Sequence, residues 1–400
     1  MLSREQKLIQ IAVAICITLG FLVFIAIYLP QKLDTKAPSP AKPQPDPAAS
    51  VDHQQTTMED NPLLAAIVEH PIEESTVQQT MFKPSKVKDP AEQPAGPLRE
   101  IGKSLQSLAW LNPDKSLRPA VDFWKSVYSE YDGNHVVMHD SLHLDIVYTV
   151  LDLSPILKDA TLSDRARIIA KEEAVDGVRD RIKHTLFRLA QGEKALTPDE
   201  QRIRELFLRV PTRKNEFLAA MDRVRGQTGQ KDKFIAGIER SQLSLGSIER
   251  IFEQQGLPKE LTRLIFVESM FNPKAHSAVG AYGIWQIMKG TAKNYGLRVD
   301  KHVDERGDLI ASSIAAAKLL KHNYQELGSW PLAINAYNAG RGRLKHAVAQ
   351  LGTKDIATIM RNYQHPAYGF ASRNFFAEFL AAYEVAAEAP KLFSMALPKK

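Results

Sequence analysis

The chain has 400 residues, 44% of them hydrophobic, so it is long enough for two or three domains and is neither fully disordered nor collagen-like. Its single cysteine, Cys16, excludes an intramolecular disulfide and a cysteine-based zinc site. A net charge of +6 is compatible with an anionic polymer or a membrane surface, but over this length it is too dilute to indicate nucleic-acid binding.

The N-terminal residues 8–30 contain no charged side chain and are rich in Ile, Val, Leu and Phe. An α-helix of this length crosses about 30 Å of hydrocarbon, so we expect a transmembrane anchor within residues 1–32. A cleaved signal peptide is the alternative, but the run ends at Pro30 without the small-x-small pattern of a cleavage site. Cys16 lies in the middle of the run, which disfavours lipidation.

Residues 33–97 are rich in Pro, Ala, Gln, Asp and Ser and show little apolar periodicity. Such a segment cannot bury enough apolar surface to offset the entropy of ordering it. We therefore predict a disordered, Pro-rich tether between the anchor and the folded part of the chain.

Residues 98–233 are predicted to form a helical accessory region. Apolar residues at spacings of three and four predict one long amphipathic helix, and further helices are expected from Thr197 and over residues 212–224. The β-branched runs at residues 136–138 and 146–150 argue against a long helix there. The apolar positions of the long helix are Val175, Val178, Ile182, Leu186 and Leu189.

A histidine cluster lies within the accessory region. His139 and His143 have the i, i+4 spacing of two zinc ligands on one helix face, and His135 and Asp140 are close to them in sequence. Against a metal site, the neighbouring residues are β-branched and no third ligand is apparent. Ordinary polar or capping histidines are the favoured interpretation, and we expect no metal.

The strongest chemical signal is Glu268. Pro258 suits the first turn of a helix, and Leu261, Leu264 and Ile265 then form an apolar stripe whose next position is Glu268. Burial disfavours the charged form of a carboxyl group, so its pKa should rise and the group should stay protonated near neutral pH, as a general acid requires. A buried salt bridge, or a glutamate that turns out to solvent, is the alternative.

Two later segments add polar side chains near glycine-rich turns. Residues 280–288 resemble a turn or hairpin, after which a new helix is expected at Thr291. There Gln286 offers a donor and an acceptor, and Trp285 either stacks on a sugar or packs in the core, core packing being favoured. Residues 330–340 predict a short helix with Pro near its start and Gly after its end, which places Tyr337 on rigid backbone.

Together these segments resemble the family 1 lytic murein transglycosylases, whose helical catalytic domain is similar to goose-type lysozyme. The resemblance covers roughly residues 234–387, and residues 123–231 more loosely resemble the segment before the catalytic domain of membrane-bound lytic transglycosylase D-like proteins. The sequence up to Lys400 contains no lysin-motif repeats. The matching residues are Glu268-Ser269, Phe271-Asn272-Pro273, Ser277, Gly280-Ala281, Gly283 to Met288, Thr291-Ala292, Tyr295-Gly296-Leu297 and Ala336 to Gly340.

The resemblance implies a role for individual residues. Glu268 matches the catalytic glutamate, and Tyr337 the tyrosine that hydrogen-bonds the glutamate or the sugar. Many family members carry a late Glu-Thr-Arg motif, but here Ala371 stands in place of its glutamate and Arg373 in place of its arginine. The substrate-binding residues implied are Ser277, Gln286, Met288, Tyr337 and Asn338.

The resemblance further implies non-hydrolytic cleavage of the β-1,4 bond between N-acetylmuramic acid and N-acetylglucosamine in peptidoglycan, without a cofactor. Because peptidoglycan lies outside the inner membrane, the catalytic domain should face the periplasm of a bacterial cell. The expected organisation is a mainly α chain with an anchor at 1–32, a tether at 33–97, an accessory region at 98–233 and a lysozyme-like catalytic domain at 234–400. Partner proteins in a cell-envelope complex are not identified by the sequence.

Three alternatives remain: a hydrolytic muramidase, a catalytically silent peptidoglycan-binding scaffold, and a zinc peptidase built on the histidine cluster. A muramidase normally needs a second carboxylate. Asp304 and Glu305 are the candidates for it, although helix capping explains the acidic cluster around them. The other acidic residues in this part of the chain, which lie outside any motif, are Glu326, Asp355, Glu378, Glu384 and Glu388.

Overall fold

The computed structural model describes residues 108–194, 197–209 and 215–393, which all belong to one unit of the chain, Gln54–Lys400. The predicted membrane segment at residues 8–30 and the predicted tether at 33–97 lie outside the described residues. None of the described helices has both the length and the apolar composition needed to cross a bilayer.

The accessory region contains a three-stranded antiparallel sheet in the order β2-β1-β3, with β1 in the centre. The region predicted as helical therefore also contains a sheet, whose strands β1 and β2 hold most of the β-branched residues that argued against a long helix. The strands are β1 (His135–Asp140), β2 (Val147–Asp152) and β3 (Val224–Thr228). The helices are η1 (Ala109–Leu111), α4 (Arg118–Ser129), α5 (Ser154–Leu157), α6 (Asp164–Ala190), α7 (Pro198–Leu206), η2 (Phe207–Arg209) and α8 (Glu216–Met221).

The predicted amphipathic helix is α6, and four of its five predicted apolar positions are buried. Helix α7 begins with a capping box, in which the Thr197 side chain and the Glu200 side chain each accept a hydrogen bond from the other residue's backbone N–H. The helix predicted over residues 212–224 is shorter in the structure, because α8 ends at Met221 and Val224 begins β3.

The second half of the described chain is helical. Its elements are α9 (Lys231–Ser241), α10 (Leu245–Gln254), η3 (Lys259–Arg263), α11 (Leu264–Ser269), α12 (Lys289–Asn294), η4 (Glu305–Gly307), α13 (Leu309–Leu327), α14 (Trp330–Ala339), α15 (Arg341–Leu351), α16 (Ile356–Asn362) and α17 (Phe370–Leu392). The helix expected at Thr291 is α12, which starts two residues earlier.

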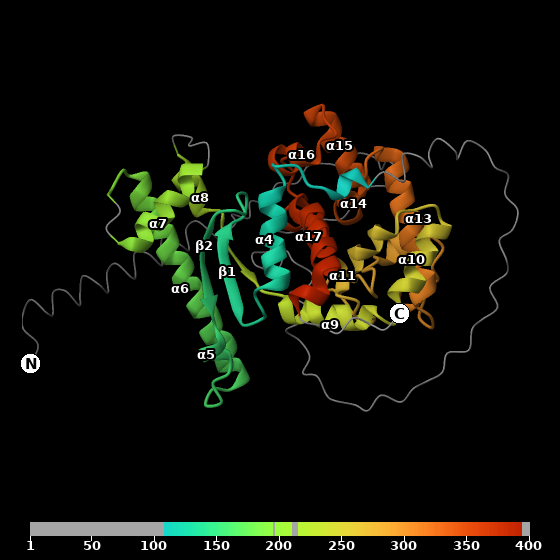
Figure 1. The fold of residues 1–400 in the computed structure, drawn as a ribbon, viewed down its shortest axis with the longest axis horizontal. Helices are drawn as coiled ribbons and strands as arrows, with labels where there is room; N and C mark the ends of the chain where they lie inside the picture. Colours follow the sequence, from blue (N-terminus) through green and yellow to red (C-terminus); the bar gives the residue numbers. More distant parts are fainter. Residues whose placement is uncertain (1–107, 195–196, 210–214, 394–400) are drawn as a thin grey trace, which may run out of the picture. The chain divides into compact units, whose positions relative to one another are not determined.

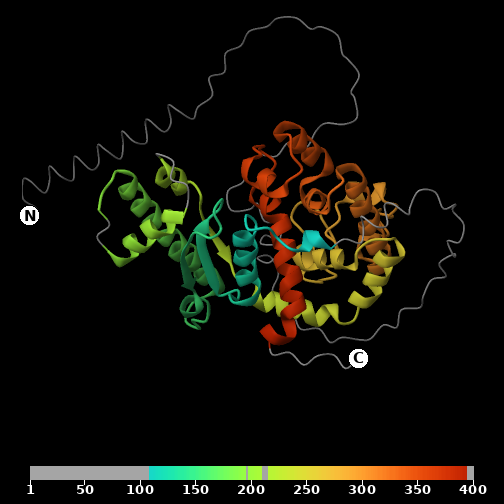
Figure 2. The ribbon, with the colours of Figure 1, turned by 45° about the horizontal axis from the view of Figure 1, so that its top comes forward.

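Helix α17 is the central element of the larger hydrophobic core. It packs against α4, α11 and α14, and both views show α4 and α17 side by side (Figure 1, Figure 2). Buried residues of α4, including Trp124 and Tyr128, belong to the same core as Phe376 and Phe379 of α17. The core is thus continuous across residues 233 and 234, where the sequence places a domain boundary.

The sheet separates this core from a smaller one. Along β1, Val136 and Met138 belong to the small core with α6, whereas Val137 belongs to the large core, as the two-residue period of a strand requires. One face of the sheet is therefore attached to the helices that carry the site described next.

Candidate active site

Glu268 lies near the C-terminal end of the short helix α11, between the buried residues Val267 and Ser269. The helix ends there because Met270 and Phe271 both adopt left-handed backbone conformations, with φ of 49° and 58°. Burial, and secondarily the negative charge of Glu378, raises the pKa of the Glu268 carboxyl group from its ordinary 4.5 to about 8. A dominant salt bridge would lower this pKa, so the group has the character of a buried acid.

The segment from His276 to Met288 folds into a braced loop beside Glu268. Tyr282 forms β-bridges with both His276 and Ile287. Arg306, which follows the loop in the chain, stabilises it: its guanidinium group donates hydrogen bonds to the backbone carbonyls of Gly280 and Ile287 at 2.7 and 3.0 Å. This brace fixes the loop against the helical core.

Gly283 makes the close approach of this loop to Arg306 possible. Its φ is +80°, and a Cβ atom at this position would lie 2.2 Å from the carbonyl oxygen of Arg306. Only glycine fits such a conformation and such a contact without displacing the backbone.

Two of the predicted substrate-binding residues, Gln286 and Ser277, form side-chain hydrogen bonds within this loop. The Gln286 side-chain amide donates to the carbonyls of Ala275 and Gly283 at 3.0 and 2.8 Å, which leaves its carbonyl oxygen as an acceptor. The Ser277 hydroxyl accepts a hydrogen bond from the backbone N–H of Ala281 at 2.9 Å. The predicted core role of Trp285 is confirmed, since its buried indole N–H donates to the Ser313 hydroxyl at 2.9 Å.

Helix α14 contributes Tyr337 and Asn338. The Tyr337 hydroxyl donates a 2.7 Å hydrogen bond to the carbonyl of Trp285, and burial followed by the charge of Glu268 raises the pKa of this phenol well above 10. The Asn338 carbonyl oxygen accepts a 2.6 Å hydrogen bond from the hydroxyl of Ser372 in α17. Tyr337 therefore ties α14 to the loop, and Asn338 ties α14 to α17.

All six residues that the sequence singles out line one cavity of about 210 Å³. Residues of α17 complete its wall, namely Phe370, Ala371, Phe375 and Glu378. Ala371 thus lies in the cavity wall, at the position where the resemblance described above implies a glutamate. The complete lining is Val267, Glu268, Ser277, Val279, Ala281, Gln286, Met288, Tyr337, Asn338, Phe370, Ala371, Phe375 and Glu378.

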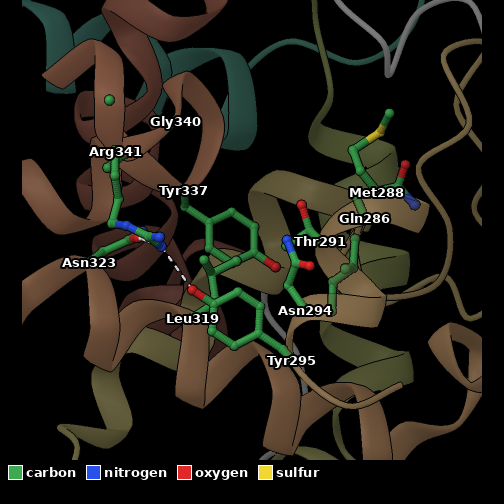
Figure 3. A pocket seen from close by; sticks show the side chains of 13 residues that line it. Gln286, Met288, Thr291, Asn294, Tyr295, Leu319, Asn323, Tyr337, Gly340 and Arg341 are labelled. Atoms are coloured by element: carbon green, nitrogen blue, oxygen red, sulfur yellow. Dashed lines mark hydrogen bonds between the residues drawn. The ribbon is translucent and has the colours of Figure 1, made fainter. Parts of the chain in front are cut away.

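A neighbouring cavity of about 280 Å³ shares Gln286, Met288 and Tyr337 with the first. Figure 3 shows its lining, with Arg341 reaching the hydroxyl of Tyr295 by a 2.8 Å hydrogen bond. The shared residues make the two cavities adjoining parts of one surface. The remaining lining residues are Ile287, Thr291, Asn294, Leu319, Asn323, Ala336, Gly340 and Gly342.

The second carboxyl group of the site is Glu378, which the sequence analysis placed outside any motif. It is nearly buried, with 9% of its surface exposed, and burial raises its pKa to about 8 although the charge of Arg225 opposes this rise. Glu378 lies within the apolar run from Phe375 to Leu380. The signal that identified Glu268, a glutamate on an apolar helix face, was available for Glu378 as well.

The two carboxylates proposed from the sequence as a second catalytic group serve the loop instead. Asp304 forms an ion pair with Arg306 at 2.7 Å, and the Glu305 carboxylate accepts the backbone N–H of Arg298 at 2.7 Å. Neither lines the cavity of Glu268. The acidic cluster therefore has a structural role: Asp304 pairs with Arg306 and caps η4, and Asp308 caps α13, as helix capping predicted.

The histidine cluster does not lie on a helix. His139 is buried in β1 between the rings of Phe123 and Phe370, at centroid distances of 4.4 and 5.6 Å, and burial lowers its pKa to about 3. His143 lies after the strand, 3.8 Å from Glu216. In the part of the chain that the structure describes, no group of three metal-binding side chains is found.

Most of the residues around this site lie in a segment that matches a known protein family. The family described as "Transglycosylase SLT domain" matches residues 248–360, which include all six predicted site residues and end before Glu378. Over 97 residues the chain is 41% identical to membrane-bound lytic murein transglycosylase D of Escherichia coli, a match that covers 24% of this chain and 22% of that protein.

Two further similarities were found. Peptidoglycan transglycosylase gp16 of Escherichia phage T7 is 36% identical over 129 residues, covering 30% of this chain and 10% of that protein. A solved structure of an inactive mutant of lytic transglycosylase Slt from Pseudomonas aeruginosa covers 54% of this chain and 38% of its own, at 16% identity and a TM-score of 0.31. The chain therefore spans about a fifth of the length of the Escherichia coli transglycosylase D and a tenth of the length of the phage T7 transglycosylase.

Proposed function

We propose that this chain, which carries a transglycosylase SLT domain, is a peptidoglycan lytic transglycosylase that uses Glu268 as its acid and base. The observation that carries the proposal is the position of Glu268, a half-buried carboxyl group, in the wall of a cavity shared with Ser277, Gln286 and Tyr337. A carboxyl group with a pKa of about 8 is protonated at neutral pH, as the first step of glycosidic cleavage requires.

In the first step, Glu268 transfers its proton to the glycosidic oxygen between N-acetylmuramic acid and N-acetylglucosamine. The bond between this oxygen and the muramoyl C1 atom breaks, and C1 develops the positive charge of an oxocarbenium-like centre. The leaving sugar departs as a neutral alcohol. The half-buried carboxyl group becomes a carboxylate, whose charge the cavity disfavours.

In the second step, the muramoyl C6 hydroxyl attacks C1 and its proton passes to the Glu268 carboxylate. This closes a 1,6-anhydro ring and restores the protonated acid, so one residue serves both proton transfers. No water is consumed and no electron is gained or lost, so the reaction balances with no cofactor.

The two adjoining cavities support a polymeric substrate. A glycan strand continues on both sides of the bond that is cut, so it needs binding surface on both sides of Glu268. Gln286, Met288 and Tyr337 belong to both cavities and would contact the sugars nearest to the reacting bond. Met288 is 43% exposed, which makes its flexible side chain available to a sugar face.

A hydrolytic muramidase is the second candidate, and Glu378 is the observation that favours it. Retaining and inverting glycosidases use two carboxyl groups on either side of the bond, and Glu378 places a second carboxyl group in the cavity of Glu268. Burial also raises the pKa of Glu378 to about 8, so at neutral pH it is mostly protonated and poorly suited to activate water. The transglycosylase is therefore the favoured candidate.

The nature of the product distinguishes the two candidates. Purified peptidoglycan sacculi are digested with the full-length chain in detergent, and the soluble fragments are analysed by mass spectrometry. A transglycosylase gives chains ending in 1,6-anhydro-muramic acid, one water lighter than the hydrolysis product. Reducing muramic acid ends as the main species would establish the muramidase, and no release of fragments would overturn both.

We further propose that the protein is a single-pass inner-membrane protein, anchored by residues 8–30 with its catalytic domain in the periplasm. The uncharged run of residues 8–30 supports the anchor, and the location of peptidoglycan supports the orientation. Accessibility of the SLT domain to protease in spheroplasts, compared with intact cells, tests this arrangement.

A further inference from the structure

Glu378 is a buried carboxyl group that the proposed reaction does not use. It projects from α17 on the same helix face as Ala371 and Phe375, at spacings of seven and three residues. All three line the cavity of Glu268. The wall that carries an alanine in place of the family glutamate therefore still presents a carboxyl group, two helical turns farther along.

The accessory region places a positive charge beside this wall. The guanidinium group of Arg225, in β3, lies over the ring of Phe370 with its central carbon 4.2 Å from the ring centroid. Phe370 lines the cavity, and the positive charge of Arg225 acts on the carboxyl group of Glu378. Because the sheet is packed on the core through β1, Arg225 is held in place by the accessory fold.

Several elements surround the two carboxyl groups with ionisable side chains. Tyr128 of α4 interacts electrostatically with both Glu268 and Glu378, and Tyr337 of α14 interacts with Glu268. The pKa values of both phenols are raised well above 10, so both remain neutral and add no charge. Among these groups Arg225 supplies the positive charge and the two glutamates supply the titrating groups.

We propose that Glu378 is a positioning residue for the proton of Glu268: as the pH rises above neutral, Glu378 loses its own proton first, with the help of Arg225, and its negative charge then retains the proton on Glu268. This inference rests on the proposed function, because it assigns Glu268 as the acid. It gives residues 108–233 a part in the chemistry, since Arg225 determines the order in which the two carboxyl groups ionise.

The order of ionisation follows from the charges around the two carboxyl groups. The charge of Glu378 raises the pKa of Glu268, whereas the charge of Arg225 lowers that of Glu378. Two interacting carboxyl groups in one cavity cannot ionise independently. The arrangement extends the range in which Glu268 remains an acid toward alkaline pH.

The experiment compares the pH dependence of sacculus digestion by the full-length wild type, Glu378→Gln and Arg225→Met, each profile normalised to its own maximum. In Glu378→Gln the alkaline limb should move to lower pH by roughly one unit, as expected for removal of a nearby like charge. Arg225→Met keeps the apolar stem over Phe370 but removes the charge. Its limb should move in the same direction, and the double variant should show no shift beyond that of Glu378→Gln.

Glu384→Gln is the matched control. This glutamate lies on the same helix, outside the cavity, and pairs with Arg118 and Lys125 of α4. Its alkaline limb should coincide with that of the wild type. Thermal unfolding of every variant identifies one that has lost its fold, and the infrared carbonyl band of protonated Glu268, assigned by comparison with Glu268→Gln, follows the titration without turnover.

The outcomes separate the two proposals. An unchanged limb and an unchanged infrared titration in Glu378→Gln would overturn the inference, as would a shift of Arg225→Met to higher pH, which would mean that Arg225 acts on Glu268 directly. Reducing muramic acid ends that disappear in Glu378→Gln would make Glu378 a catalytic group of a hydrolase and overturn it too. A wild type without activity but with a coupled infrared titration would overturn the proposed function alone.

Discussion

The hydroxyl group of Tyr337 donates its hydrogen bond to the backbone carbonyl oxygen of Trp285, at 2.7 Å. A hydroxyl group has one proton to donate, so what Tyr337 can offer to Glu268 or to a sugar hydroxyl is an acceptor. This polarity fits a protonated Glu268, which is a donor. The side chain therefore fixes the loop and faces the cavity at the same time.

Replacing Tyr337 by phenylalanine should reduce both stability and activity. Loss of the bond to Trp285 leaves a buried carbonyl without this donor, at a cost of about 1 kcal/mol in the free energy of unfolding. Loss of the acceptor should lower the rate of sacculus digestion, but less than removal of the acid does. Tyr383→Phe, on α17 outside the cavity, is the control. A Tyr337→Phe protein with wild-type rate and melting temperature would contradict the assignment.

Glu268→Gln should remove catalysis and preserve the fold. The amide keeps the size and polarity of the protonated acid but has no transferable proton, so the rate of digestion should fall by ~10²-fold or more, the order of a general acid–base contribution. Release of soluble fragments from sacculi measures this rate. Glu253→Gln, on the exposed side of α10, is the control, and a Glu268→Gln protein that retains its rate would exclude Glu268 as the acid.

Stability should fall as the pH rises from about 4.5 toward 8. The pKa values of Glu268 and Glu378 in the folded chain are raised from 4.5 to about 8, so in this window the unfolded chain releases protons that the folded chain retains. Their stabilising effect is complete below the unfolded pKa and disappears as the pH approaches the folded pKa. Either glutamine variant should therefore gain stability relative to the wild type at pH 8, on the order of a few kcal/mol, and much less at pH 4. Denaturant titrations at the two pH values measure this difference.

Gly283→Ala should displace the loop that carries Gln286. The new Cβ atom would lie 2.2 Å from the Arg306 carbonyl oxygen, and the backbone has a φ of +80°. Gly280→Ala is a matched control, since φ is +88° there but no other atom lies within 4 Å of the added carbon. The control should show the left-handed strain alone, about 1–2 kcal/mol, and Gly283→Ala a larger loss with a marked fall in activity. Equal losses in the two variants would show that the contact with Arg306 is unimportant.

Deleting Met1 to Gln31 should release the protein from membranes. The deleted stretch includes the whole uncharged run of residues 8–30, and the remaining chain should still digest isolated sacculi. Fractionation of cells in high salt, followed by an assay of the supernatant, checks both expectations. A truncated protein that stays in the membrane fraction would indicate a second attachment site.

Much of the site could be predicted from the sequence because its local signals are strong. Glu268 follows an apolar stripe, and the glycines around Gln286 mark the turn that holds it. The sheet was missed because β3 contains Arg225, Gly226 and Gln227, which give little strand signal, and its pairing partner β1 is some ninety residues away. Such long-range pairing is set by tertiary packing and not by local propensity.

Glu378 was missed for a related reason. Its position in an apolar helix could be read, but the approach of α17 to α11 could not, because the two helices are separated by a hundred residues of chain. The family resemblance also directed attention to position 371, where a carboxyl group is lacking. The position of Arg225 near the cavity could not be predicted either, because its contact with Phe370 joins the accessory region to the last helix.

The packing of α4 along α17 limits how this chain can be divided. If the segment matched by the family were cut out alone, it would lose the helix that carries Glu378 as well as the aromatic residues of α4 that cover that helix. The fragment would expose an apolar surface and would lack part of its cavity wall. The segment that the family matches is therefore not an interchangeable module, and a recombinant fusion or domain exchange would have to transfer it together with α4, β3 and α17.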